Sequence, residues 1–145
     1  MKQERFKMIA AAYLMYIRAG KILMIRRYNT GYADGEYSLP AGHLEDGETL
    51  TECLIREAKE EANVTLKAKD ITLAHVMHRK SNDIRMDFFF VANTSKSEPK
   101  NMEPDKSDDM QWFPLSALPA NTVPYIRAAI RRYQKKIFYS EYGWD

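Results

Sequence analysis

The sequence predicts an α/β fold, an α/β/α sandwich with a mixed β-sheet, formed by a single domain that spans residues 1–145. Three observations lead to this prediction. Runs rich in β-forming residues lie on both sides of one amphipathic helical segment, and a second helical segment lies near the end of the chain. The length of 145 residues is that of one ordinary domain, and 45% hydrophobic residues suffice for a sizeable core. We find no internal repeat, low-complexity tract or domain linker.

The first part of the chain is predicted to form strands. Residues 6–17 and 21–27 are rich in β-forming residues, and the turn signal at Gly20 separates them. Residues 28–36 contain several turn-forming residues and are expected to be a loop. Residues 37–40 are predicted to be a short strand, which its final proline must place at an edge or an end of the sheet.

A helix is predicted to begin near Thr49. Thr49 is followed three residues later by Glu52, which has the form of a capping box. Apolar residues then recur every four positions and are expected to face the core, namely Leu50, Leu54, Ala58 and Ala62. The charged residues of this segment are therefore predicted to face a cleft.

The second part of the chain returns to strands. Residues 71–78 and 84–92 are predicted to form a hairpin, followed by a polar loop over 93–109 and a short strand over 111–113. A closing helix is predicted over 124–136, with a proline in its first turn and apolar residues at helical spacing. The aromatic tail is expected to pack on the body of the protein or on a partner.

Three glutamates of the first helical segment carry the chemistry. Glu57, Glu60 and Glu61 are three and four residues apart, so a helix places them on one face. Like charges this close repel one another, unless a cation lies among them. Clustered carboxylate oxygens are the ligands that Mg2+ and Mn2+ prefer. The spacing therefore predicts a site for a divalent metal ion.

Residues 42–64 as a whole resemble the Nudix box, the signature of the Nudix hydrolase family. The positions of that signature are filled by Gly42, Glu48, Arg56, Glu57, Ala58, Glu60, Glu61 and Val64. Asn63 stands where the family usually has glycine. A left-handed residue that ends the helix explains this position, and asparagine tolerates that conformation next best after glycine. Residues 39–45 and 112–119 extend the resemblance beyond the box.

The resemblance implies an enzyme that hydrolyses a nucleoside diphosphate linked to another group X, with Mg2+ or Mn2+ as cofactor. It implies metal ligands from Glu57, Glu60, Glu61 and the carbonyl of Gly42, with an extra ligand from the loop acid Glu103. It implies that Arg56 holds a glutamate in place, and Glu48 and Glu60 are its expected partners. The general base stays open between a box glutamate and Glu103. The alternative for Glu103 is an ordinary solvated acidic loop.

Residues outside the box are expected to hold the base and group X. Tyr32, His43, His78 and Phe88 are the candidate substrate-binding residues, although aromatic residues and a lone histidine are more often structural. Further aromatic and basic candidates are Tyr28, Tyr37, Trp112, Tyr125, Arg79, Lys80, Arg85 and Lys106. The sequence does not say which of the basic residues meet the phosphates.

Three functions remain open on the sequence. The favoured one is a nucleoside triphosphate pyrophosphohydrolase that yields the monophosphate and pyrophosphate. The alternatives are a nucleotide-sugar or ADP-ribose diphosphatase and a catalytically silent nucleotide sensor. The sensor is disfavoured because every box carboxylate is present and no separate DNA-reading domain is seen.

Composition bounds the partners and the location. The net charge of +2 is too small to predict binding to duplex nucleic acid, and no apolar run approaches the ~20 residues that cross a membrane. The single cysteine, Cys53, is expected to be a buried helix residue, and one cysteine is typical of a reducing cytoplasm, so a cytoplasmic protein is expected. No His/Cys pattern predicts zinc. A nucleotide is the expected partner, and a homodimer stays open.

Overall fold

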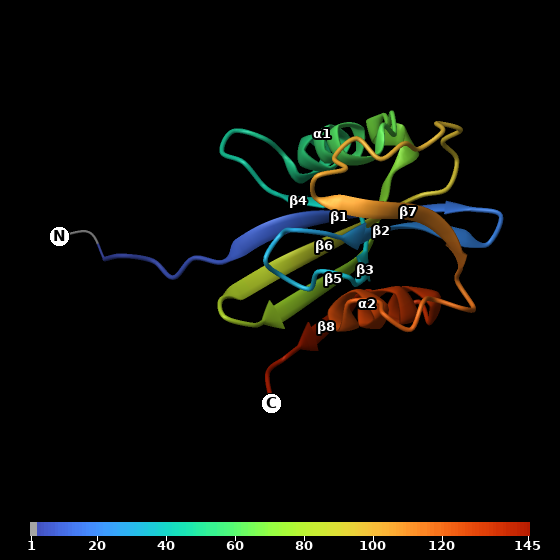
Figure 1. Ribbon diagram of the computed structural model, residues 1–145. Coiled ribbons are helices and arrows are strands. Elements are labelled where there is room, and N and C mark those ends of the chain that lie inside the picture. The colour runs from blue at the N-terminus through green and yellow to red at the C-terminus, as the bar shows by residue number, and fades with distance from the viewer. Residues whose placement is uncertain (1–2) are drawn as a thin grey trace.

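The computed structural model describes residues 3–145, and one mixed sheet with a helix on each face organises them (Figure 1). The strands are β1 Ile9–Arg18, β2 Lys21–Arg27, β3 Tyr37–Ser38, β4 Ala41–His43, β5 Thr72–Lys80, β6 Ile84–Ala92, β7 Ser107–Pro114 and β8 Tyr139–Tyr142. The helices are α1 Leu50–Ala62, the short 3-10 helix η1 Ala68–Asp70 and α2 Pro124–Gln134. The predicted fold class is confirmed.

The sheet is mixed because its central strands run in the same direction. Its order is β3-β2-β1-β6-β5-β8, with β4 also paired to β1 and β7 paired to β2. β1 pairs in parallel with β6 over eight residues, from Ile9 opposite Arg85 to Tyr16 opposite Ala92. Parallel strands are normally covered on both faces, and here α1 and α2 provide that cover.

Alternating residues of β1 build the two halves of the core. Tyr13 and Met15 pack in the cluster on the α2 side, whereas Leu14 and Tyr16 pack in the cluster on the α1 side. All four are buried, which explains why β1 reads as a nearly continuous apolar run. The sheet is therefore held from both sides, and its strand ends are fixed relative to both helices.

Both ends of α1 are as the sequence predicts. The Thr49 hydroxyl accepts a hydrogen bond from the Glu52 amide at 3.1 Å, and the Glu52 carboxylate accepts one from the Thr49 amide at 2.9 Å. At the other end Asn63 adopts the left-handed conformation, with φ 57° and ψ 29°. The capping box and the left-handed residue are both confirmed.

Two strands were not predicted, and some strand bounds differ. β4 has three residues and β8 has four, too few for an alternating pattern to be visible in the sequence. β4 pairs antiparallel with β1, and β8 pairs in parallel with β5 at the edge of the sheet. β1 begins at Ile9 rather than at residue 6, and β7 begins at Ser107, inside the predicted loop. Among the described residues, no helix is long and apolar enough to cross a membrane.

Candidate active site

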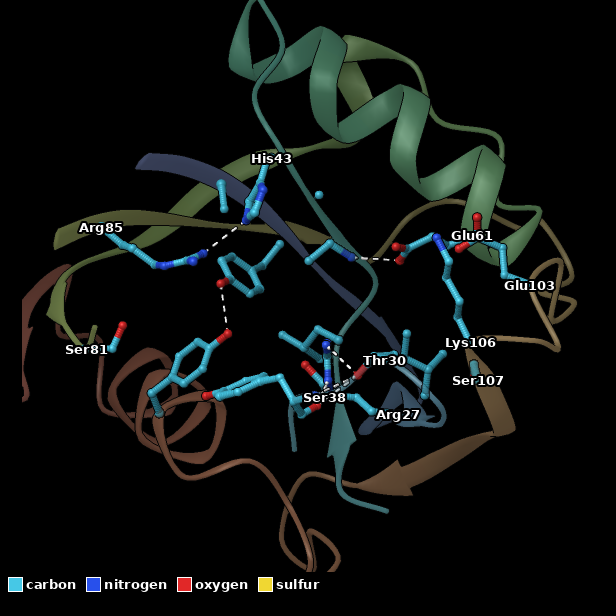
Figure 2. A pocket seen from close by; sticks show the side chains of 18 of the residues that line it. Arg27, Thr30, Ser38, His43, Glu61, Ser81, Arg85, Glu103, Lys106 and Ser107 are labelled. Atoms are coloured by element: carbon cyan, nitrogen blue, oxygen red, sulfur yellow. Dashed lines mark hydrogen bonds between the residues drawn. The ribbon is translucent and has the colours of Figure 1, made fainter. Parts of the chain in front are cut away.

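A cavity of about 870 Å3 opens beside the start of β4 and the end of α1 (Figure 2). It is within the usual range of small-molecule sites, roughly 300–1,000 Å3. Its walls come from β1, β4, the loop before β3, the ends of β5 and β6, the loop before β7, and the ends of both helices. The box therefore supplies one wall of a larger cavity.

Gly42 lies directly against Glu57. A Cβ atom on residue 42 would overlap the Glu57 side chain, so only glycine leaves room for this carboxylate. Burial is the largest influence on Glu57 and raises its pKa, a shift that Arg56 opposes and Glu60 and Glu103 reinforce. The contact joins the first and central positions of the box.

Arg56 is the centre of an ion-pair cluster on α1. It donates to Glu48 at 2.8 Å and 3.1 Å, to Glu57 at 2.6 Å and to Glu60 at 3.3 Å. The hydrogen bond from Arg56 is also the main reason why the pKa of Glu48 falls to about 2. Both expected partners of Arg56 are thus found, and the arginine orients carboxylates that would otherwise repel one another.

Glu61 faces the cavity from the last turn of α1. Its carboxylate accepts a hydrogen bond from the Ala41 amide at 2.9 Å, which ties α1 to β4. Burial raises the pKa of Glu61 to about 8, and the neighbouring charges of Glu57 and Glu103 act in the same direction. Glu61 is therefore a poorly compensated acid that a cation would stabilise.

The loop before β7 brings Glu103 to the end of α1. The Lys100 amide donates to the Ala62 carbonyl at 2.8 Å, and the Met102 amide donates to the Glu61 carbonyl at 3.1 Å. These bonds satisfy carbonyls that the end of a helix leaves free. Glu103 lines the cavity together with Glu61, so the loop delivers an additional acid to the box wall.

The four candidate substrate-binding residues fall into two pairs. The role of Tyr32 and His43 in substrate binding stays a prediction, and both residues line the cavity. His78 does not; it lies 4.7 Å from the Trp144 ring between ring centroids. Phe88 packs with the core cluster on the α1 side. Both lie on the face of the sheet opposite to Arg79 and Asp87 and outside the cavity lining, so their role in substrate binding stays a prediction without a contact to this cavity.

Several cavity residues were not singled out in the sequence. Arg27 enters from the end of β2 and Thr30 from the loop before β3, where Asp34 accepts hydrogen bonds from the Thr30 side chain and amide. Tyr13 enters from the middle of β1. In the sequence, a tyrosine within a strand is indistinguishable from a core residue, and the loop residues are typical of turns. Only the folded structure shows that these residues line the cavity. Of the wider candidates, Arg79, Arg85, Lys106 and Tyr125 do line the cavity.

The acids fit a divalent cation by their chemistry. In the part of the chain that the structure describes, no three His, Cys, Asp or Glu side chains converge closely enough to form a ready metal site. Glu57 and Glu61 nevertheless both have raised pKa values, and each is influenced by the charge of Glu103. These carboxylates lie close together, and within the described chain only Glu57 among them is paired to an arginine, so they are a donor set that Mg2+ or Mn2+ would satisfy.

Comparison with known proteins places the chain in a family. The sequence model described as the NUDIX domain matches residues 7–133. The chain therefore belongs to the Nudix family of hydrolases, and the resemblance noted in the sequence is confirmed.

The relatives differ in what their names say they act on. A NAD-capped RNA hydrolase from Chromobacterium violaceum is 32% identical over 84% of this chain and 44% of the relative. An ADP-ribose pyrophosphatase from Methanocaldococcus jannaschii is 33% identical over 68% of this chain and 57% of the relative. The chain thus spans about half the length of these relatives.

A solved structure agrees with the fold over nearly its whole length. The crystal structure of a MutT NUDIX hydrolase from Burkholderia pseudomallei superposes with a TM-score of 0.79 and 25% identity. The match covers 87% of this chain and 98% of that one.

Proposed function

We propose that the chain is a metal-dependent hydrolase of the phosphoanhydride bond in a nucleoside diphosphate linked to another group. The observation that carries the proposal is the meeting of box and loop acids: Gly42 seats Glu57, while Glu61 and Glu103 line the same cavity wall. A diphosphate is strongly anionic, and this wall is acidic, so a cation must lie between them. Mg2+ or Mn2+ held by Glu57, Glu60, Glu61, Glu103 and the Gly42 carbonyl would supply that charge and lower the pKa of a water molecule.

The chain's own residues prepare this wall. Arg56 holds Glu48, Glu57 and Glu60 in fixed orientations, so we assign Arg56 and Glu48 positioning roles. The Ala41 amide holds one Glu61 oxygen. A glutamate with a raised pKa is suited to accept a proton near neutral pH, which makes Glu57 and Glu61 candidates for the general base. Glu103 is a further candidate because it lines the same cavity wall. Tyr32 and His43 lie where they could contact base or group X.

Our leading substrate is a nucleoside triphosphate, cleaved to the monophosphate and pyrophosphate. The second candidate is an ADP-ribose-like or nucleotide-sugar diphosphate. Two observations favour the second candidate: the cavity extends well beyond the box wall, and one relative is named an ADP-ribose pyrophosphatase. A silent nucleotide sensor is disfavoured, since the box carboxylates are all present.

A product-resolved substrate screen tests the proposal. The purified protein is incubated with nucleoside triphosphates, ADP-ribose and nucleotide sugars in Mg2+ or Mn2+, and the products are separated by chromatography. Pyrophosphate from a triphosphate supports the leading substrate, and two monophosphates from ADP-ribose or a nucleotide sugar support the second. A protein that binds nucleotides but cleaves none of these compounds would support the sensor instead.

A further inference from the structure

Two arginines face the cavity from directly opposed positions of one hairpin. Arg79 on β5 and Arg85 on β6 are cross-strand partners, so their side chains leave the same face of the sheet. Both line the cavity. Figure 2 shows Arg85, beside His43, across the cavity from Glu61 and Glu103. Like charges directly opposite one another destabilise a sheet, and here Asp87 pairs with Arg79 and Asp83 pairs with Arg85.

Arg79 is held rigidly with its donors free. Its Nε donates to Asp87 at 2.6 Å, and its side chain is only 6% exposed. Its Cζ lies 3.6 Å from the centroid of the Tyr125 ring. Among residues 3–145, neither terminal nitrogen of Arg79 donates to a protein acceptor. Each of these nitrogens keeps a small accessible surface, and Arg79 lines the cavity, so its planar donors can be reached from there.

The partners of Arg79 are fully engaged with one another. Asp87 is completely buried, and its second oxygen accepts a hydrogen bond from the Tyr13 hydroxyl at 3.1 Å. The Tyr13 and Tyr125 hydroxyls are 2.9 Å apart and share a hydrogen bond. The network therefore fixes the guanidinium of Arg79 in two ways: Asp87 holds its Nε, and the Tyr125 ring covers one face of its plane. A group that enters the cavity meets donors that need no rearrangement.

Arg85 adds a second set of donors beside the first. Its Nε donates to Asp83 at 2.8 Å, and one terminal nitrogen lies 3.0 Å from Nε2 of His43. Arginine keeps its protons, so in this arrangement it donates and the histidine nitrogen accepts. Arg85 is 23% exposed, and its paired Asp83 is 43% exposed, so the pair remains accessible from the cavity.

A purely structural role explains this arrangement poorly. Apolar residues of similar size stabilise a core as well as a buried ion pair does. A structural pair would also not leave the terminal nitrogens of Arg79 without an acceptor, nor need a second arginine opposite. Burial alone would lower the pKa of Arg79, but the hydrogen bond and charge of Asp87 raise it, so the guanidinium stays charged.

We propose that Arg79 and Arg85 form an oxyanion subsite, distinct from the box wall, which binds a phosphate or carboxylate carried by the substrate in addition to its scissile diphosphate. Within the proposed function, this subsite selects substrates in which group X or the nucleoside has its own anionic group. Planar guanidinium donors match the paired oxygens of such a group. The box acids repel it, so the two walls would orient the substrate from opposite ends.

Anion binding without metal tests this subsite directly. The protein is kept in EDTA and titrated with inorganic phosphate, and in parallel with acetate, while NMR follows the Nε–H signals of Arg79 and Arg85. We expect saturable shifts of both signals. Arg85→Gln should weaken binding by at least ~10-fold, because a hydrogen bond to a charged group is lost. Arg85 is chosen because removal of Arg79 would leave Asp87 buried and unpaired.

Arg26→Gln is the matched control. Arg26 also donates its Nε to an aspartate, Asp108, at 2.7 Å, and is 36% exposed, but it does not line the cavity. Its variant should bind phosphate within about twofold of the original protein, as expected for a surface change. Tighter binding of phosphate than of acetate assigns the subsite to a phosphoryl group, and the reverse assigns it to a carboxylate.

The absence of saturable binding of either anion would overturn the inference. So would equal affinities of Arg85→Gln and Arg26→Gln. The inference rests on the proposed function only for the use of the subsite, since the measurement involves neither metal nor turnover. Failed hydrolysis with normal phosphate binding would reject the proposed function alone, and the opposite result would reject the subsite alone.

Discussion

Glu60 and Glu61 are neighbours in the chain but lie in different surroundings. Glu61 faces the cavity and bonds to the Ala41 amide, whereas Glu60 is 55% exposed and bonds to Arg56. We expect Glu60→Gln and Glu61→Gln each to lower kcat by at least ~10^2, because each removes a charge from the proposed metal site. Steady-state rates at saturating Mg2+ measure this. Glu98→Gln, at an exposed position away from the cavity, is the control and should retain full turnover.

Wild-type turnover in both box variants would show that this face of α1 is only a charged surface. A loss in Glu61→Gln alone would restrict the metal site to the residues that face the cavity. In either variant, retained circular dichroism would separate a catalytic loss from unfolding.

The raised pKa of Glu61 predicts how stability depends on pH when metal is removed. Its pKa is about 8 in the folded protein, against an ordinary 4.5, so the folded state retains a proton that the unfolded state loses. The resulting stability is present below pH 4.5 and is lost as pH rises through about 8. In EDTA, Tm should therefore fall over this range. Glu61→Gln, which cannot ionise, should show a smaller fall, and parallel Tm curves would contradict the account.

Glu103 is the loop acid whose role the sequence left undecided. If it binds metal or acts as the base, Glu103→Gln should lower kcat by roughly 10–10^3, with little change in Tm. Asp105→Asn is the matched control, because Asp105 is exposed in the same loop and does not line the cavity. Equal turnover of the two variants would return the base role to the box glutamates.

At the level of elements, Asn63 decides how α1 ends. Its φ of 57° places it in the left-handed region, which glycine adopts without strain and β-branched residues adopt only at an energetic cost. Asn63→Gly should be neutral or slightly stabilising, whereas Asn63→Val should cost about 1–2 kcal/mol of unfolding free energy. Urea denaturation measures both. Asn82→Val, at an exposed asparagine without positive φ, provides the control. Equal stability of the valine and glycine variants at position 63 would contradict this explanation.

The elements that the sequence predicted best are those with strong local signals. α1 has its capping box and four-residue apolar spacing, and β2 and β6 have the predicted bounds. β4 and β8 were not predicted because they are short and form by pairing with β1 and β5, which no local sequence pattern encodes. The start of β7 at Ser107 was not predicted for a similar reason, because this polar residue joins the sheet by pairing with Arg27.

At the level of the whole molecule, the sequence predicted one half of the cavity. The box residues were found because their spacing is dictated by a helix. In the opposite half, Tyr13 was not singled out in the sequence, and Arg79 and Tyr125 were only two of many candidates. The parallel pairing of β1 with β6 and the position of α2 bring these distant residues together. His78 and Phe88 lie outside the cavity lining, and the sequence could not show this because one residue of register decides which face of a strand a side chain takes.

The central claim is that the acidic wall acts through a divalent metal ion, and metal removal tests it most directly. Turnover of the best substrate from the screen should vanish in EDTA and return with excess Mg2+ or Mn2+, without a requirement for zinc. The same ions should raise the Tm of the original protein, and raise that of Glu61→Gln much less. Full turnover in a metal-free sample, or an equal rise in Tm for both proteins, would contradict the account.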